Sequence, residues 1–84
     1  MDKIDFTTLI LSISTAAFMG LGVSPPGSQE EVKVDLKLAR HNIDLLELLL
    51  QKTKGNLSEE ELKLLEQVLY ETRIKYLEVQ KTNS

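Results

Sequence analysis

The sequence predicts an all-α protein, because side chains recur at helical spacing on both sides of a single turn. Upstream of the turn, apolar residues are three and four positions apart, at Leu36, Ala39, Ile43, Leu46 and Leu50. Downstream, the same spacing places mostly apolar residues at Leu62, Leu65, Leu69, Thr72, Tyr76 and Val79. Such spacing puts each set on one side of a helix. We therefore expect helices over about residues 36–54 and 59–80, packed as an antiparallel hairpin.

The turn itself, residues 52–58, contains residues that end one helix and begin the next. Gly55 can adopt the left-handed conformation that closes a helix, and the lysines on either side of Thr53 suit the negative end of the helix macrodipole. Ser58, with Glu61 three residues later, is a capping box that begins the following helix. These residues predict both helix ends at the turn, and they predict a positive φ at Gly55.

The composition is that of one small domain of 84 residues. A chain of this length buries a smaller share of its surface than a larger domain does, so a second copy or a partner often completes its core. The net charge of −3 gives no electrostatic case for nucleic acid, which is bound through clustered Lys and Arg. The absence of cysteine excludes disulfides, thiolate metal sites and cysteine catalysis.

A first helix is predicted over about residues 6–20, with Asp5 as its N-cap residue. No charged residue occurs between Phe6 and Gln29, and this helix is apolar on nearly every side. Small residues occupy every fourth position of it, at Thr8, Ser12, Ala16 and Gly20, which we call the small-residue stripe. Small side chains at this spacing let two helices approach closely, so the first helix is predicted to mediate oligomerisation.

Three interpretations of this apolar segment compete. A signal peptide is disfavoured, because Asp2 and Asp5 offset Lys3 where a positively charged region is expected. A membrane-spanning helix over residues 6–23 is an alternative, since about 18 residues lie at the short end of the spanning range. We favour a helix buried in a protein assembly, because five hydroxyl side chains dilute the apolar run.

The remaining segments connect or end these helices within one domain, residues 1–84. Residues 22–34 are a predicted linker, since they hold both prolines and two of the four glycines. Asp35 is the predicted N-cap residue of the second helix. The polar residues 81–84 are expected to form a frayed tail.

The apolar surface of these helices exceeds what three short helices can cover. Three more leucines widen the stripe of the second helix to nearly half of its circumference, which one neighbour cannot cover: Leu38, Leu45 and Leu49. The third helix has a second apolar stripe on another of its sides. We therefore expect a homo-oligomer, a two-fold dimer before a tetramer. The predicted interface combines residues of the first and third helices: Thr8, Ser12, Ala16, Gly20, Phe6, Ile10, Ile13, Tyr70, Ile74 and Leu77.

Catalysis is not expected, because the residues that would support it are missing. The chain has no Gly-rich phosphate loop, no nucleophile with a base at workable spacing and no metal-ligand cluster. His41 is the sole histidine and falls on a polar helix face, so no metal or other cofactor is predicted. A site, if present, would lie near Arg73, Tyr70 and Tyr76. The simpler interpretation is that the tyrosines close the end of the hairpin and that Arg73 pairs with a carboxylate.

Five blocks of sequence cover almost the whole chain: DFTTLILS (5–12), VDLKLAR (34–40), NIDLLELL (42–49), KTKGNL (52–57) and LLEQVLYETRIKYL (64–77). By these blocks the sequence resembles a small bacterial family known only as a domain of unknown function. The specific part is KTKGNL followed at this distance by LYETRIKYL, because leucine-rich blocks match any helical hairpin. The resemblance implies a stand-alone bacterial protein of the cytoplasm, and it carries no catalytic residues to transfer.

The function that these observations predict is a self-associating structural or protein-interaction module without catalytic activity. We expect a second copy of the chain as its partner, with an additional protein partner left open and no nucleic acid. The alternative is a membrane-associated protein anchored by residues 6–23, which contain no Lys or Arg.

Overall fold

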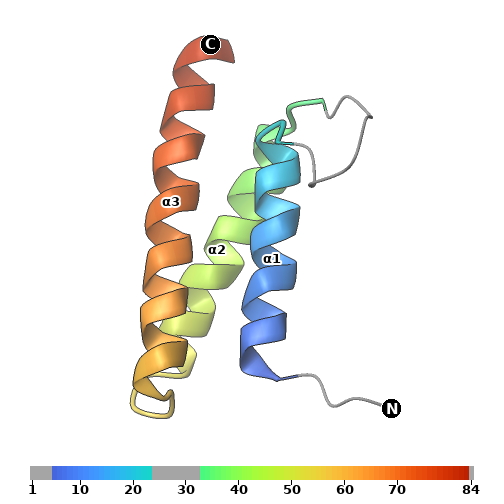
Figure 1. The fold of residues 1–84 in the computed structure, drawn as a ribbon. Coiled ribbons are helices and arrows are strands. Elements are labelled where there is room, and N and C mark those ends of the chain that lie inside the picture. The colour runs from blue at the N-terminus through green and yellow to red at the C-terminus, as the bar shows by residue number, and fades with distance from the viewer. Residues whose placement is uncertain (1–4, 24–32, 84) are drawn as a thin grey trace, which may run out of the picture.

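The computed structural model describes residues 5–23 and 33–83, and these form three helices and no strand (Figure 1). In chain order the helices are α1 (Phe6–Gly20), α2 (Leu36–Lys52) and α3 (Glu59–Asn83). The predicted all-α fold and all three predicted helices are confirmed. Most of the predicted linker lies outside the described residues.

The end of α2 comes two residues earlier than predicted. Thr53 is its C-cap residue, and both the N–H and the hydroxyl of Thr53 donate to the carbonyl of Leu49. These bonds satisfy a carbonyl that the helix leaves without a partner, and residues 53–57 then form the turn. Gly55 has a φ of 85°, which confirms the predicted left-handed conformation.

The end of α3 comes three residues later than predicted. The helix continues to Asn83, so the expected tail is corrected: residues 81–83 are helical, and Ser84 lies outside the described residues. The hydroxyl of Thr82 donates to the carbonyl of Glu78 at 3.0 Å within this last turn.

The predicted starts of the helices are confirmed by their caps. The Asp5 carboxylate accepts a hydrogen bond from the N–H of Thr8 at 2.7 Å, and hydrogen bonds from Thr8 lower the pKa of Asp5. Asp35 accepts from the N–H of Leu38 at 3.1 Å in the same way. At α3, the N–H of Ser58 donates to Glu61 at 2.9 Å, and the N–H of Glu61 donates to Ser58 Oγ at 3.2 Å. This exchange is the capping box that the sequence predicts.

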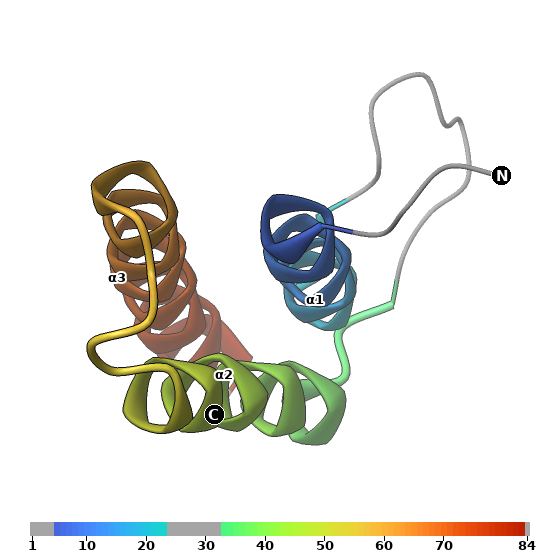
Figure 2. The same cartoon turned by 90° about the horizontal axis from the view of Figure 1, so that it is seen from below.

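The three helices pack so that each contacts both of the others. Figure 1 shows α1 and α3 running in one direction and α2 running in the opposite direction. Seen from below in Figure 2, α2 lies across the view while α1 and α3 are closer to end-on, so α2 crosses them obliquely. The packing of α2 on α1 is more extensive than its packing on α3. The predicted pairing of α2 with α3 is therefore not the dominant contact of this fold.

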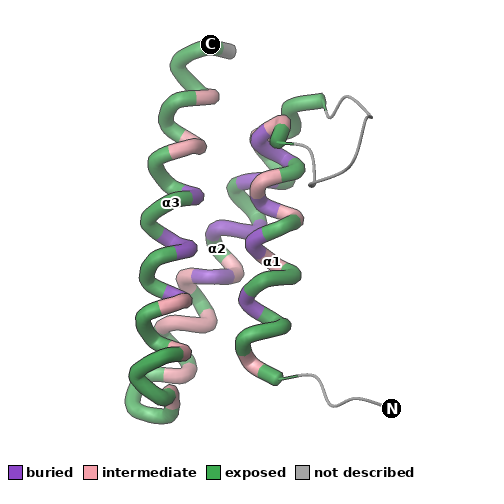
Figure 3. The backbone as a smooth tube through the Cα atoms, viewed as in Figure 1, coloured by how far each residue is buried: buried purple, intermediate pink, exposed green. Residues whose placement is uncertain are grey.

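The core lies where the three helices converge, and Figure 3 shows the buried segments of each helix on the sides that face the others. Every helix contributes to one cluster of buried apolar side chains: Ile10, Ala17, Ile43, Leu46, Leu65, Val68 and Leu69. Two buried polar side chains are satisfied by their own helices, since Asn42 donates to the carbonyl of Leu38 and Thr72 to that of Val68. Backbone carbonyls thus remove the cost of burying these polar groups.

The C-terminal end of α1 joins the N-terminal end of α2 at unusually close range. The N–H of Asp35 donates to the carbonyl of Gly20 at 2.7 Å. A Cβ atom on Gly20 would lie 2.7 Å from the backbone nitrogen of Ala39, closer than real Cβ atoms approach. The two helices meet here because Gly20 has no side chain.

Candidate functional site

The outer face of α3 carries three large side chains that the rest of the chain leaves in water. Tyr70 is 66% exposed, Ile74 39% and Leu77 56%. They are four and three residues apart, so they lie along one side of the helix. We call these three residues the α3 stripe.

The α3 stripe is exposed because α3 has two apolar sides and only one of them faces the core. Leu65, Leu69 and Thr72 point inward and are buried against α1 and α2. The C-terminal turns of α3 also extend past the ends of α1 and α2 (Figure 1). Apolar residues exposed together on one side of a helix are a candidate interaction surface.

A groove between α2 and α3 borders the α3 stripe. One pocket of about 290 Å³ in this groove is lined by residues of both helices: Arg40, Ile43, Glu47, Arg73, Tyr76, Leu77 and Gln80. The guanidinium of Arg73 donates to the carboxylate of Glu47, with Nε 3.2 Å from Oε1. This ion pair links the two helices across the groove, because Arg73 belongs to α3 and Glu47 to α2.

The possible site at Arg73, Tyr70 and Tyr76 is not assembled into one place. Tyr76 is half-buried and packs against the core, whereas Tyr70 is 66% exposed, more than any other exposed large hydrophobic residue of the described chain. The two tyrosines line different pockets, and Arg73 lies at the edge of both. The predicted pairing of Arg73 with a carboxylate is confirmed, and Glu47 is its partner.

At the end of the groove formed by Arg40, the charged side chains pair with each other while exposed to solvent. Arg40 donates to Asp44 at 3.2 Å, and both side chains are more than half exposed. The hydrogen bond and charge of Asp44, and then the Tyr76 hydroxyl, raise the pKa of Arg40, which remains protonated in any case. His41 lines the same pocket as Arg40 and Asp44. Within residues 5–23 and 33–83, no group of three or more His, Asp or Glu side chains is placed to hold a metal ion.

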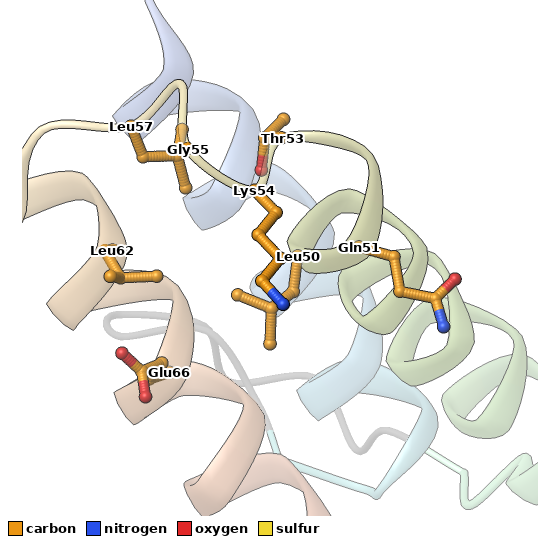
Figure 4. A pocket seen from close by; sticks show the side chains of 8 residues that line it. All are labelled: Leu50, Gln51, Thr53, Lys54, Gly55, Leu57, Leu62 and Glu66. Atoms are coloured by element: carbon orange, nitrogen blue, oxygen red, sulfur yellow. The ribbon is translucent and has the colours of Figure 1, made fainter.

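The turn between α2 and α3 contains a second pocket, of about 530 Å³ (Figure 4). Leu50 from α2, Leu57 from the turn and Leu62 from α3 form its apolar lining. Lys54 and Glu66 add charged groups, and Figure 4 shows the Lys54 side chain extending over Leu50. The pocket holds one carboxylate and no histidine, so it is suited to an apolar side chain rather than to acid–base chemistry.

The predicted interface residues of α1 are divided between the core and the surface. Ile10 and Gly20 are buried within the chain, so their predicted place at an oligomer interface is corrected. Phe6, Ile13 and Ala16 are half-buried, and Thr8 and Ser12 are exposed. The physical reason is the helical repeat: residues four apart are rotated by about 40°, so a stripe over three such steps turns by about 120°. The small-residue stripe therefore begins in solvent and ends in the core.

Two exposed leucines and the pocket at the turn were not predicted as surface features. Leu38 is 43% exposed, although it belongs to the wide apolar arc that was expected to face neighbouring helices. Leu48, which lies outside that arc, is 48% exposed. The pocket depends on how the turn places Leu57 between two helix ends, which spacing within one helix does not reveal. Among the described residues, no helix is long and apolar enough to cross a membrane.

The fold and this surface define a class: a small all-α protein with one buried core and an apolar stripe left open on its last helix. The chain matches a family model described as "Domain of unknown function (DUF1844)" over residues 3–78, and it belongs to that family. The resemblance based on the sequence blocks is thereby confirmed at the level of the family. No curated protein and no solved structure matches the chain.

Proposed function

We propose that this protein is a self-associating interaction module without catalytic activity, and that copies of it meet through the α3 stripe. The observation that supports the proposal is the exposure of Tyr70, Ile74 and Leu77 on one side of one helix. The guanidinium of Arg73, which lies within the span of the α3 stripe, is paired with Glu47 on α2.

The free energy available to such an assembly is substantial for a chain of this size. Fully burying one Leu, Ile or similar side chain contributes about 1.5–3 kcal/mol. In a two-fold dimer each copy contributes the same surface, so every residue of the α3 stripe counts twice. Small domains bury a limited fraction of their surface alone, and association is a common way to bury more. A dimer is the expected assembly, with a tetramer as the next alternative.

The proposal includes no cofactor, no metal and no nucleic-acid partner. The net charge of −3 disfavours binding to phosphate backbones. The charged side chains around the groove are engaged with one another, as Arg73 is with Glu47 and Arg40 with Asp44. The family resemblance supports the cytoplasm as the expected location.

Light scattering coupled to size-exclusion chromatography tests the proposal through Leu77→Gln. The wild-type protein at micromolar concentration is expected to have the mass of a dimer. Leu77→Gln removes apolar surface from both copies, and a loss of about 1.5–3 kcal/mol per copy shifts the protein to the monomer. Leu48→Gln is the matched control, because Leu48 is similarly exposed, at 48%, but lies on α2 outside the groove.

The two variants give opposite outcomes if the proposal is right. Leu48→Gln keeps the dimer mass, and Leu77→Gln loses it. A monomeric mass for the wild-type protein contradicts self-association, and equal effects of both substitutions contradict the choice of α3 as the interface.

A further inference from the structure

The α3 stripe has nearly the same spacing in both directions along the helix, with opposite charges at its two ends. Glu66 lies four residues before Tyr70, and Lys81 lies four residues after Leu77. Both charged residues are exposed. At about 100° per residue, all five residues fall within about 80° of the helix circumference. They form one line on one face, with Glu66 at one end, Lys81 at the other and apolar side chains between, and Lys63 lies on the same face one turn before Glu66.

A line with this symmetry is complementary to a reversed copy of itself. A two-fold axis beside Ile74 exchanges Tyr70 with Leu77 and exchanges Glu66 with Lys81. Tyr70 then packs on Leu77 of the second copy, and Ile74 packs near its own counterpart. Glu66 meets Lys81 of the second copy at each end of the contact, so both charged contacts are attractive.

Other arrangements of the same face bring like charges together. A parallel pairing places Glu66 against Glu66 and Lys81 against Lys81 of the second copy, which is repulsive at both ends. An antiparallel pairing with Tyr70 against Ile74 places Lys63 opposite Lys81, again like charges. Of these three arrangements, only the register centred beside Ile74 matches apolar with apolar and acid with base.

Three other charged side chains of this part of α3 pair to either side of the line. Arg73 is turned toward Glu47 on α2, with Nε 3.2 Å from Oε1. Lys75 pairs with Glu78 at 3.9 Å on the opposite flank. The centre of the line therefore remains apolar while its ends are charged, which is the arrangement that a close helix pair requires.

We propose that two copies of this chain pair antiparallel along α3 in this register, a proposal that rests on the function proposed above. Tyr70 packs on Leu77 of the second copy, and Glu66 pairs with Lys81 of the second copy. The occupant of the α3 stripe is thus a second α3, related by a two-fold axis beside Ile74.

Disulfide trapping tests the direction of the pairing, and the chain is suited to it because it contains no cysteine. Tyr70→Cys and Leu77→Cys are prepared with tags of different mass, mixed and oxidised. The mixed disulfide is expected to exceed either symmetric disulfide by at least about tenfold, since only Cα atoms within about 7 Å can be bridged. A predominance of symmetric disulfides shows a parallel pairing and overturns the proposal. Formation of no disulfide by a protein that remains dimeric also overturns it.

Charge reversal tests the register without cysteine. Glu66→Lys and Lys81→Glu are each expected to raise the dimer Kd about 3- to 30-fold, because two attractive contacts become repulsive. The double substitution restores both pairs and returns Kd to within about threefold of the wild-type value. In a parallel pairing neither single substitution weakens the dimer, since like charges already face each other there. Thermal unfolding of each variant checks that the fold is kept.

The outcomes separate this proposal from the one on which it rests. A monomeric wild-type protein contradicts both. A wild-type dimer with symmetric disulfides, or with a Kd that charge reversal leaves unchanged, contradicts the antiparallel register and leaves self-association standing.

Discussion

The junction of α1 with α2 and the outer face of α3 both carry apolar residues at helical spacing. At the junction these residues are buried between the helices, and we call it the closed region; on α3 they are exposed. At the junction, Ala17 and Ala39 are fully buried and Gly20 allows the two backbones to approach. On α3, Tyr70 and Leu77 are more than half exposed. Small residues close an interface within one chain because they let helices touch, whereas large residues need a surface that faces them.

Because of this difference, we expect the residues that stabilise the monomer to lie in another part of the molecule than those that form the proposed assembly. Substitutions in the closed region are expected to change the free energy of unfolding of a single chain. Substitutions on the α3 stripe are expected to change the assembly and to leave the monomer nearly unaffected. The predictions that follow test this separation, beginning with the largest effect.

Leu46→Ala is expected to destabilise the monomer by about 2–5 kcal/mol, because it removes a side chain from the packed core. Leu46 is fully buried in the cluster that all three helices share. Urea unfolding, at a concentration low enough for the wild-type protein to be monomeric, measures the loss. Leu77→Ala is the matched control and is expected to cost less than about 0.5 kcal/mol under these conditions. Similar losses for the two leucines would contradict the separation.

Gly20→Ala is expected to destabilise by about 1–3 kcal/mol, because the added methyl overlaps the backbone of α2 and forces the helices apart. The Cβ would lie 2.7 Å from the nitrogen of Ala39, a backbone atom that cannot rotate away. The loss is measured by urea unfolding as before. Ala16→Ser is the control, since it changes a half-buried member of the same stripe by one small polar atom. An unchanged stability for Gly20→Ala would show that the close approach is not required.

Most of the secondary structure could be predicted because its determinants are local. Each helix start is marked by side-chain hydrogen bonds to backbone groups three residues away, made by Asp5, Asp35 and the Ser58–Glu61 pair. The sequence alone therefore shows where each helix starts. The ends of α2 and α3 were predicted less accurately, because helix ends fray and residue spacing does not fix the last helical residue.

The packing could be predicted only where a stripe stays on one side of its helix. The α3 stripe extends over eight residues and remains on one face, as its spacing predicts. The small-residue stripe extends over thirteen residues, and its drift around α1 carries Gly20 into the core, where it lies against α2. Which neighbour each helix prefers was not predictable, since close packing of α2 on α1 depends on residues far apart in sequence.

Ser58→Ala tests the start of α3 and is expected to cost about 0.5–2 kcal/mol through loss of the cap. The hydroxyl accepts the N–H of Glu61, which has no partner inside the helix. The effect belongs to monomer stability, so the dimer Kd is expected to stay constant. Ser58→Asp keeps an acceptor at the cap and is the control, with a loss of less than about 0.5 kcal/mol. A loss as large for Ser58→Asp as for Ser58→Ala would indicate that the cap is not the cause.

The smallest effect is expected at the border between the two regions, where Arg73 pairs with Glu47. Both side chains are about half exposed, so solvent screens the pair and its coupling energy is expected to be about 0.2–1 kcal/mol. A double-mutant cycle of Glu47→Gln and Arg73→Gln, followed by urea unfolding, isolates this energy from the effects of each residue alone. The coupling is expected to shrink further at about 1 M salt, where the Debye length is about 3 Å. A coupling above about 2 kcal/mol that salt does not reduce would mean that the pair belongs to the closed region. The residues that stabilise the monomer would then extend closer to the α3 stripe than the exposed fractions indicate.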